Sequence, residues 1–313
     1  MTRYLIVRLF AALPVLLLVT VMAFVAIRIV PGDLASVRLG EGATPQDVEA
    51  LREQLGLDAP IYEQYLSWLG ELAQGDPGVS LQSGLPVGEQ FRKRLPVTVE
   101  LAILTTLVSL TIAIPLGVVS AIRSGTALDQ AVRVVAVLGQ AVPSFWLAIL
   151  ALTFLSIYWH WAPPFTYRSP WEAPWHNLQQ LLLPSLILGY AQSALLMRTI
   201  RSAMIEVLSQ DYIRTASAKG LRGRTVVFRH ALRNALIPAT TIVGIQTTTL
   251  MGGAIVLEQI FSLPGVGKLT LDAITNRDYT QLQFNVVFIA VIAMAINLVV
   301  DLSYLYSDPR LRR

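Results

Sequence analysis

The residue types best suited to catalysis or metal binding are too scattered in this chain to form a site. The three histidines lie far apart in the sequence, and there is no cysteine that could complete a metal centre. The segment Pro264–Thr270 ends like a phosphate-binding loop, but Ser262 occupies a position where that loop needs glycine. We therefore predict no catalytic residue, no metal site and no cofactor bound by this chain.

Charged side chains are almost absent from the long apolar runs of the sequence, and Glu100, Glu258 and Asp301 lie near the ends of such runs. Proton-driven carriers usually need carboxylates or histidines inside the membrane as relays, so the sequence argues against a secondary transporter. Uncharged polar residues do occur inside these runs. They suit either a water-lined path for a solute or hydrogen bonds between helices. The candidates for a substrate pathway are Gln140, Ser144, Gln192 and Gln246.

The stretch Glu206–Pro238 is basic and lies between two of the apolar runs. Asp211 is placed to accept a hydrogen bond at the start of a short helix over 212–219. Gly220 suits the left-handed conformation that ends many helices. Thr225 is a candidate cap for a second helix, so the stretch predicts a helical hairpin.

One face of the first helix in this hairpin carries Ile213, Ala216 and Gly220, at spacings of three and four residues. The face is small, so we expect another protein to approach it closely. A basic helix could also contact nucleic-acid phosphates. The stretch offers only Tyr212 and Phe228 for stacking and is held by apolar runs at both ends, so we predict no nucleic-acid partner.

The composition places the chain in a membrane. Hydrophobic residues make up 54% of the 313 residues, charged residues only 14%, and the mean hydropathy is +0.58. A soluble domain carries roughly 25% charged residues, so most of this chain needs an apolar surrounding. Six apolar runs are long enough to cross about 30 Å of hydrocarbon as helices. These runs are Leu9–Val30, Pro96–Ile122, Ala131–Tyr158, Leu178–Ile200, Ala235–Leu257 and Phe284–Tyr306.

Residues 31–95 form the only sizeable polar region. Thr44 and Pro45 predict the start of a helix, Gly56 its end, and Pro60 the start of a second helix. The apolar stripes of these helices are too small for a free-standing domain, so we expect a small helical cap. Tyr65 and Trp68 either pack within this region or contact an external binding protein.

The distribution of lysine and arginine predicts the orientation. These residues gather at both termini, between the second and third runs, and between the fourth and fifth runs. The positive-inside rule then places both termini and the central loop in the cytoplasm, and the polar region outside. We expect a cytoplasmic N-terminus with the first transmembrane helix (1–30), an extracytoplasmic helical region (31–95), a membrane domain of five helices (96–306) that includes a cytoplasmic loop (201–234), and a cytoplasmic tail (307–313).

The central loop also resembles the EAA loop of permease subunits from ABC importers. The resemblance is carried by Ala216–Leu221, where Ser217 replaces an arginine common in that loop, followed by His230, Arg233–Ala235 and Pro238. The sequence is most similar to the peptide and nickel permeases. Further matches occur in the right order along nearly the whole chain: Leu55–Pro60, Gln64, Tyr65, Trp68, Gly75–Gly78, Glu258–Gly267 and Asp308–Arg310.

This resemblance implies an all-α polytopic membrane protein of six transmembrane helices with the type I ABC importer permease fold and a small helical extracytoplasmic insertion. It also implies that the central loop couples the chain to an ATPase. The implied coupling residues are Asp211, Tyr212, Ile213, Ala216, Ser217, Ala218, Lys219, Gly220 and Leu221.

The implied assembly contains a second homologous permease chain, two cytoplasmic ABC ATPases that hold ATP and Mg²⁺, an extracytoplasmic solute-binding protein and membrane lipid. It implies a location in the cytoplasmic membrane of a bacterium or archaeon. The expected function is the translocation of dipeptides or oligopeptides, driven by ATP hydrolysis on the partner subunits. A permease for nickel or another small solute is the alternative, and a membrane scaffold without transport is a more distant one.

Overall fold

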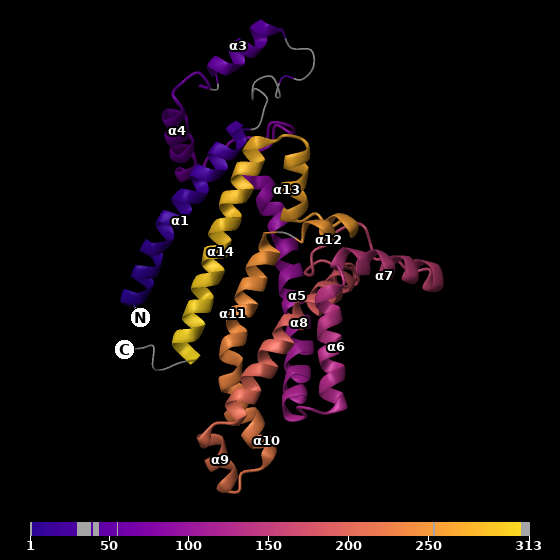
Figure 1. The fold of residues 1–313 in the computed structure, drawn as a ribbon. Coiled ribbons are helices and arrows are strands. Elements are labelled where there is room, and N and C mark those ends of the chain that lie inside the picture. The colour runs from indigo at the N-terminus through magenta and orange to yellow at the C-terminus, as the bar shows by residue number, and fades with distance from the viewer. Residues whose placement is uncertain (1, 30–38, 40–43, 55, 253, 308–313) are drawn as a thin grey trace. The chain divides into compact units, whose positions relative to one another are not determined.

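In the computed structural model the chain is helical (Figure 1). The structure describes residues 2–29, 39, 44–54, 56–252 and 254–307. Apart from one isolated bridge between Val79 and Pro86, these residues form helices and turns. The chain divides into two compact units, one made of Met1–Pro96 and Gly265–Ala295, the other of Val97–Pro264 and Ile296–Arg313. Helices α5 and α14 contribute residues to both units.

The helices of the first unit bury aromatic and aliphatic side chains against one another. Phe91 stacks edge-on against Phe284, with ring centroids 5.5 Å apart, in a cluster that also contains Val87 and Leu269. The elements of this unit are α1 (Thr2–Ile29), α3 (Pro45–Gln54), α4 (Ile61–Ala73), the first part of α5 (Val87–Ile122), α13 (Val266–Thr275) and most of α14 (Tyr279–Ser307).

The predicted helix boundaries of the polar region are confirmed. The Thr44 hydroxyl accepts from the Asp47 amide while the Asp47 carboxylate accepts from the Thr44 amide, so α3 begins with a reciprocal cap. Gly56, with φ of 64°, follows the end of α3. Tyr65 and Trp68 of α4 lie against Phe24 of α1, which confirms the packing interpretation of these two aromatic residues.

Asp278, just before α14, holds the loop that precedes α5. Its carboxylate accepts from the Ser80 hydroxyl and from the Leu81 amide at 3.1 Å. One turn into α14, the Gln281 amide donates to Asn285 at 2.7 Å, and Asn285 donates to Thr270 of α13 at 3.1 Å. The Asp278 contacts join segments of the first unit that are nearly 200 residues apart in the sequence.

The second unit is built around α8, against which α6 and α11 pack (Figure 1). Buried side chains of α5, α6, α8 and α11 form its main apolar cluster. The remaining elements of this unit are α6 (Ala127–Ala141), α7 (Ser144–Trp159), α8 (Pro174–Leu208), α9 (Asp211–Ala218), α10 (Gly223–Thr225), the π-helix η1 (Val226–Ala231), α11 (Leu232–Met251) and α12 (Ile255–Ile260).

The helices agree with the predicted spans in part. By length and composition, α5, α8 and α14 can each cross a membrane, and α6 with α7 makes a fourth span if the bent pair is counted as one. The apolar part of α1, Phe10–Ala26, is shorter than each of α5, α8 and α14. The six-span count therefore stays a prediction.

Three of the expected apolar runs differ from the helices that the structure shows. The run 131–158 is not one straight helix, because α6 ends at Ala141 and α7 leaves it at 97° after Pro143. Proline has no amide hydrogen to continue the helical ladder, so the break falls at a residue type that interrupts helices. The run 235–257 ends earlier, at Met251. Helix α5 begins at Val87, nine residues before the expected position.

Glycine allows close approach where α5 and α8 cross. A Cβ added at Gly189 would lie 2.5 Å from the Val108 side chain and 2.9 Å from the Thr105 carbonyl oxygen. Such distances are too short for real contacts, so the two backbones can come this close only because residue 189 is glycine. Small residues at helix crossings are common in membrane proteins for this reason.

We predict that Gly189→Ala lowers the stability of the purified chain by about 1–3 kcal/mol, because the methyl group must push α5 away from α8. Gly70→Ala is the control, since a Cβ at that helical position meets no atom within 4 Å. The measurement is the apparent melting temperature in detergent. Equal values for the two variants would contradict the close packing of α5 on α8.

Candidate coupling site and pathway residues

The central loop forms a helical hairpin at one end of the second unit (Figure 1). Helix α8 ends at Leu208, α9 begins at Asp211, and a continuous helical segment made of α10, η1 and α11 returns from Gly223. The predicted first helix, 212–219, differs from α9 by one residue at each end. The hairpin therefore has the predicted form.

Gly220 ends α9 as predicted. Its φ is 78°, in the left-handed region that favours glycine. The Gly220 amide donates to the Ser217 carbonyl at 3.0 Å, and the Leu221 amide donates to the Ala216 carbonyl at 3.4 Å. These two bonds are the pair of a Schellman motif, which satisfies carbonyl groups that the end of a helix leaves without partners.

The two predicted helix caps are wrong. Gln210 is the N-cap residue of α9 and makes no side-chain cap bond, while Asp211 already has helical position and pairs with Arg214 at 3.4 Å. The second helix begins at Gly223, so Thr225 lies inside it rather than before it. An acidic residue in the first turn is still favourable, because it complements the positive end of the helix dipole.

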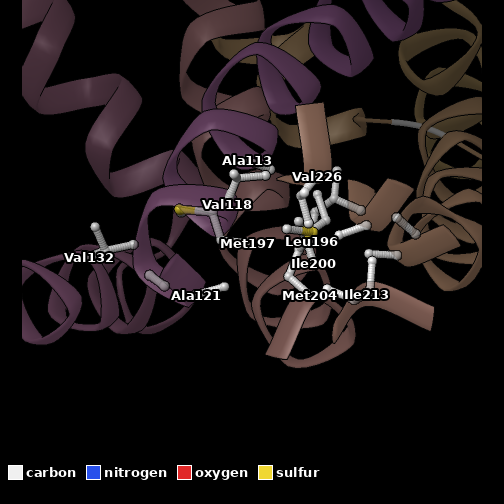
Figure 2. Packing of buried hydrophobic residues seen from close by; sticks show 14 of the residues in the cluster. Ala113, Val118, Ala121, Val132, Leu196, Met197, Ile200, Met204, Ile213 and Val226 are labelled. Atoms are coloured by element: carbon white, nitrogen blue, oxygen red, sulfur yellow. The ribbon is translucent and has the colours of Figure 1, made fainter. Parts of the chain in front are cut away.

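The face of α9 that we expected to point outward is in fact buried inside the chain. Ile213 and Ala216 are 4% and 8% exposed, and they belong to the main apolar cluster of the second unit. Figure 2 shows Ile213 close to Met204 of α8 within this cluster. The physical reason is that α9 has a single apolar stripe, and burying it against α8 and η1 stabilises the hairpin without any partner.

The opposite face of α9 is the exposed one and is therefore the candidate docking surface. The exposed residues over 211–221 are Asp211, Tyr212, Arg214, Thr215, Ser217, Ala218, Lys219, Gly220 and Leu221. Tyr212 is 44% exposed, and its hydroxyl accepts from the Asn234 amide at 2.8 Å. This bond ties α9 to α11. Seven of the nine predicted coupling residues are thus accessible to a partner. The other two, Ile213 and Ala216, are buried and hold α9 against the core of the unit.

Asp129, at the start of α6, is the centre of a charged network that the sequence reasoning missed. Its side chain is 1% exposed and accepts from the Ser120 hydroxyl at 2.5 Å and the Gly125 amide at 3.0 Å. Arg201 of α8 donates to both carboxylate oxygens, from Nε at 2.8 Å and from Nη2 at 2.9 Å. This two-point bond joins the α5–α6 turn to α8, two turns before α8 ends.

A signal for Asp129 was present in the sequence. Thr126 caps α6 by accepting from the Asp129 amide at 3.4 Å, so the two residues have the spacing of a capping motif. The partner on α8 is more than 70 residues away. No local pattern indicates that pairing, and in the sequence Arg201 is only one of several basic residues between the fourth and fifth apolar runs.

The structure brings only two of the four predicted pathway residues into direct contact. The Gln246 amide on α11 donates to the Gln192 carbonyl on α8 at 2.9 Å, so the structure brings these two residues together. The Gln140 amide oxygen on α6 accepts from Arg198 on α8 at 2.9 Å. Ser144 is the first residue of α7, after the bend. All four are at least partly exposed, which a pathway role requires.

Further polar side chains are buried in the second unit without a hydrogen-bond partner in the described part of the chain. Unsatisfied buried groups cost free energy, so they mark places where water, solute or a change in packing matters. No sequence pattern distinguished them from ordinary span residues. They are Thr105, Ser109, Gln180, Ser185 and Thr248.

A second polar network lies at the start of α8. The Glu100 carboxylate on α5 accepts from the Tyr167 hydroxyl and from the Asn177 amide, both at 2.9 Å. Burial, and then the hydrogen bond to Glu100, raises the pKa of Tyr167, so this phenol stays protonated as the donor. In the residues that the structure describes, no three histidine or carboxylate side chains gather in a way that could hold a metal ion.

Comparisons with known proteins cover the whole chain. A family profile described as "Binding-protein-dependent transport system inner membrane component" matches residues 113–313, and its N-terminal companion matches residues 1–102. The chain is 38% identical over 332 residues to the dipeptide transport system permease protein DppB of Alkalihalophilus pseudofirmus, covering 100% of both proteins. It is 39% identical over 315 residues to the oligopeptide transport system permease protein AppB of Bacillus subtilis, covering 99% of both.

The fold is similar to that of a chain in the inward-facing MetNI methionine ABC transporter. The TM-score is 0.58 at 15% sequence identity, and the match covers 71% of this chain and 98% of that chain. This agreement confirms the expected all-helical fold of an ABC importer permease.

We predict that Asp129→Asn lowers the apparent melting temperature of the purified chain by roughly 5 °C or more. The reason is that Arg201 loses its charged partner at a position where the residue 129 side chain is buried. Asp211→Asn is the matched control. Its carboxylate also pairs with an arginine but is 95% exposed, so we expect almost no change. A similar shift in both variants would show that the Asp129 network does not hold α8.

A second pair of variants tests the end of α9. Gly220→Ala should weaken the local structure by about 1 kcal/mol, since alanine disfavours a positive φ. Gly223→Ala is the control, because a Cβ meets no atom within 4 Å at either position and only Gly220 has a positive φ. Amide hydrogen exchange across α9 is the measurement. We expect faster exchange only for Gly220→Ala, and equal exchange in the two variants would contradict the Schellman motif.

Proposed function

Since the chain belongs to the family of inner membrane components of binding-protein-dependent transport systems, we propose that it carries peptides across the membrane as the permease subunit of an ATP-driven importer. The peptide class is supported by two relatives that match over essentially the whole length and are named dipeptide and oligopeptide permeases. The chain supplies the membrane pathway, and ATP hydrolysis takes place on partner subunits.

The observation that carries this proposal is the two-faced helix α9. Its inner face is fixed in the core of its own unit, and its outer face is open. When a partner displaces such a helix, the transmembrane helices move with it, because its buried side chains belong to the same apolar cluster as theirs. The outer face is short and carries Arg214, Ala218 and Leu221, so a shallow groove on a soluble ATPase fits it.

The route from the docking surface into the membrane part runs through α8. Ile213 of α9 and Met204 of α8 share one apolar cluster, and Arg201 of α8 is bonded to Asp129 at the α5–α6 turn. A displacement of α9 therefore moves α8 and the α5–α6 hairpin together. In an alternating-access cycle, ATP binding at one site and opening at another are linked through such a shared body.

The proposed assembly has two permease chains, two cytoplasmic ATPases with ATP and Mg²⁺, and an extracytoplasmic binding protein. The second permease is a homologous chain. Both termini and the hairpin around α9 lie in the cytoplasm, as the positions of lysine and arginine favour. The membrane is the cytoplasmic membrane of a bacterium or archaeon.

The test uses substitutions on the outer face of α9. Ala218→Trp adds a large side chain to an exposed position and leaves the buried stripe untouched. We expect normal membrane insertion, at least tenfold less co-purified ATPase, which corresponds to about 1.4 kcal/mol of binding, and a matching loss of labelled dipeptide uptake. Ala127→Trp is the control, because Ala127 is also exposed but lies on α6.

Two results would contradict this function. Full ATPase binding by Ala218→Trp would remove α9 as the docking element. Intact ATPase binding combined with no uptake of any dipeptide or oligopeptide by the unmodified complex would leave the coupling role and exclude the peptide substrate.

A further inference from the structure

A polar pocket of about 340 Å³ opens beside the C-terminal end of α1. The pocket is lined by Arg28 from the last turn of α1 and by side chains of α4. The lining residues of α4 are Glu63, Gln64, Ser67, Trp68 and Glu71. The functional assignment above uses none of them.

Arg28 is held rigidly in this pocket. Its Nε and Nη2 atoms donate to the Gln64 amide oxygen at 3.2 and 2.7 Å, and Nη1 donates to the Phe24 carbonyl at 3.3 Å. The guanidinium lies over the Phe24 ring, with Cζ 3.4 Å from the ring centroid. Gln64 is itself fixed, since its amide nitrogen donates to the carbonyls of Leu57 and Ala59. Arg28 is therefore positioned before any ligand arrives.

The charge of Arg28 is not neutralised by these contacts. All of its bonds go to neutral oxygen atoms, and no carboxylate among the described residues forms an ion pair with it. A guanidinium has five N–H donors, and these bonds use three, which leaves one on each terminal nitrogen. Two such donors match the two free oxygens of a phosphate group.

A simple anion does not fit the rest of the pocket, because the exposed carboxylates Glu63 and Glu71 would repel it. The same carboxylates would attract a cation. A ligand that suits the whole pocket therefore carries a phosphate and, a short distance away, a positive group that can donate hydrogen bonds.

The position of the pocket indicates a lipid as the source of this ligand. Arg28 follows the apolar stretch Phe10–Ala26 by two residues, the depth at which basic side chains reach the head groups of a membrane. Beside it, α4 exposes Ile61, Tyr62 and Leu66, at 56%, 61% and 61%. An amphipathic helix with such a face lies in the membrane interface.

We propose that this pocket binds the head group of phosphatidylethanolamine. The phosphodiester accepts from the two remaining N–H groups of Arg28, and the primary ammonium donates to Glu63 and Glu71. The lipid fastens α4 to α1 at the membrane surface and so fixes the helical region that follows the first span.

The test is retention of lipid by the intact complex, purified from nanodiscs of equal phosphatidylethanolamine and phosphatidylglycerol and analysed by native mass spectrometry. We expect the unmodified protein to retain phosphatidylethanolamine in excess, and Arg28→Gln to retain about tenfold less, as the loss of charge-assisted hydrogen bonds predicts. Arg92→Gln is the matched control, because Arg92 is exposed on α5 and outside the pocket. Unchanged retention by Arg28→Gln would overturn the proposal.

A second variant keeps the test valid if Arg28→Gln does not fold. The double change Glu63→Gln and Glu71→Gln alters only exposed side chains and should bring the ratio of the two retained lipids close to that of the nanodisc. An unaltered preference for phosphatidylethanolamine in this variant would refute the ammonium site. A final arm adds inorganic phosphate to lipid-free protein in detergent. Stabilisation by phosphate equal to that by phosphatidylethanolamine would show an anion site and overturn the lipid assignment.

Discussion

The burial of the inner face of α9 is the interaction on which the rest of the second unit depends for its function. A helix of eight residues is not stable alone in water, so α9 exists because Ile213 and Ala216 are covered by α8 and η1. The same packing places the helix in the apolar core of the second unit. In the coupling mechanism proposed above, one set of apolar contacts therefore both stabilises the docking element and transmits its movement.

How far the sequence could predict this site depends on the range of the interaction involved. Gly220 was predictable, because a left-handed helix end is decided by its own backbone and the next residue. The direction of the small face of α9 was not, since an apolar stripe on a short helix suits a partner's groove and the chain's own core equally well. Only the apolar cluster that other elements of the unit supply, including Met204 of α8, decides between them. The pairing of Asp129 with Arg201 was hidden for the same reason.

The fold shows the same division between local and distant causes. Composition and the length of apolar runs identified a helical membrane protein and the helices α5, α8 and α14, because these properties belong to each segment alone. The bend after Pro143 was marked by a residue that breaks helices, but its angle depends on what α7 packs against, including Leu181 and Leu257 in a second apolar cluster. Hydropathy measures how apolar a segment is and contains no information on its direction.

Helix α8 meets its neighbours α5 and α11 in different ways. At its crossing with α5, Gly189 leaves no room for even a methyl group, so this contact is fixed. Toward α11 the contact includes a polar bond, because the Gln246 side chain donates to a backbone carbonyl of α8. Of the four candidate pathway residues, Gln192 and Gln246 therefore meet where α8 packs against α11, and a solute path along this surface has to open the hydrogen bond between them.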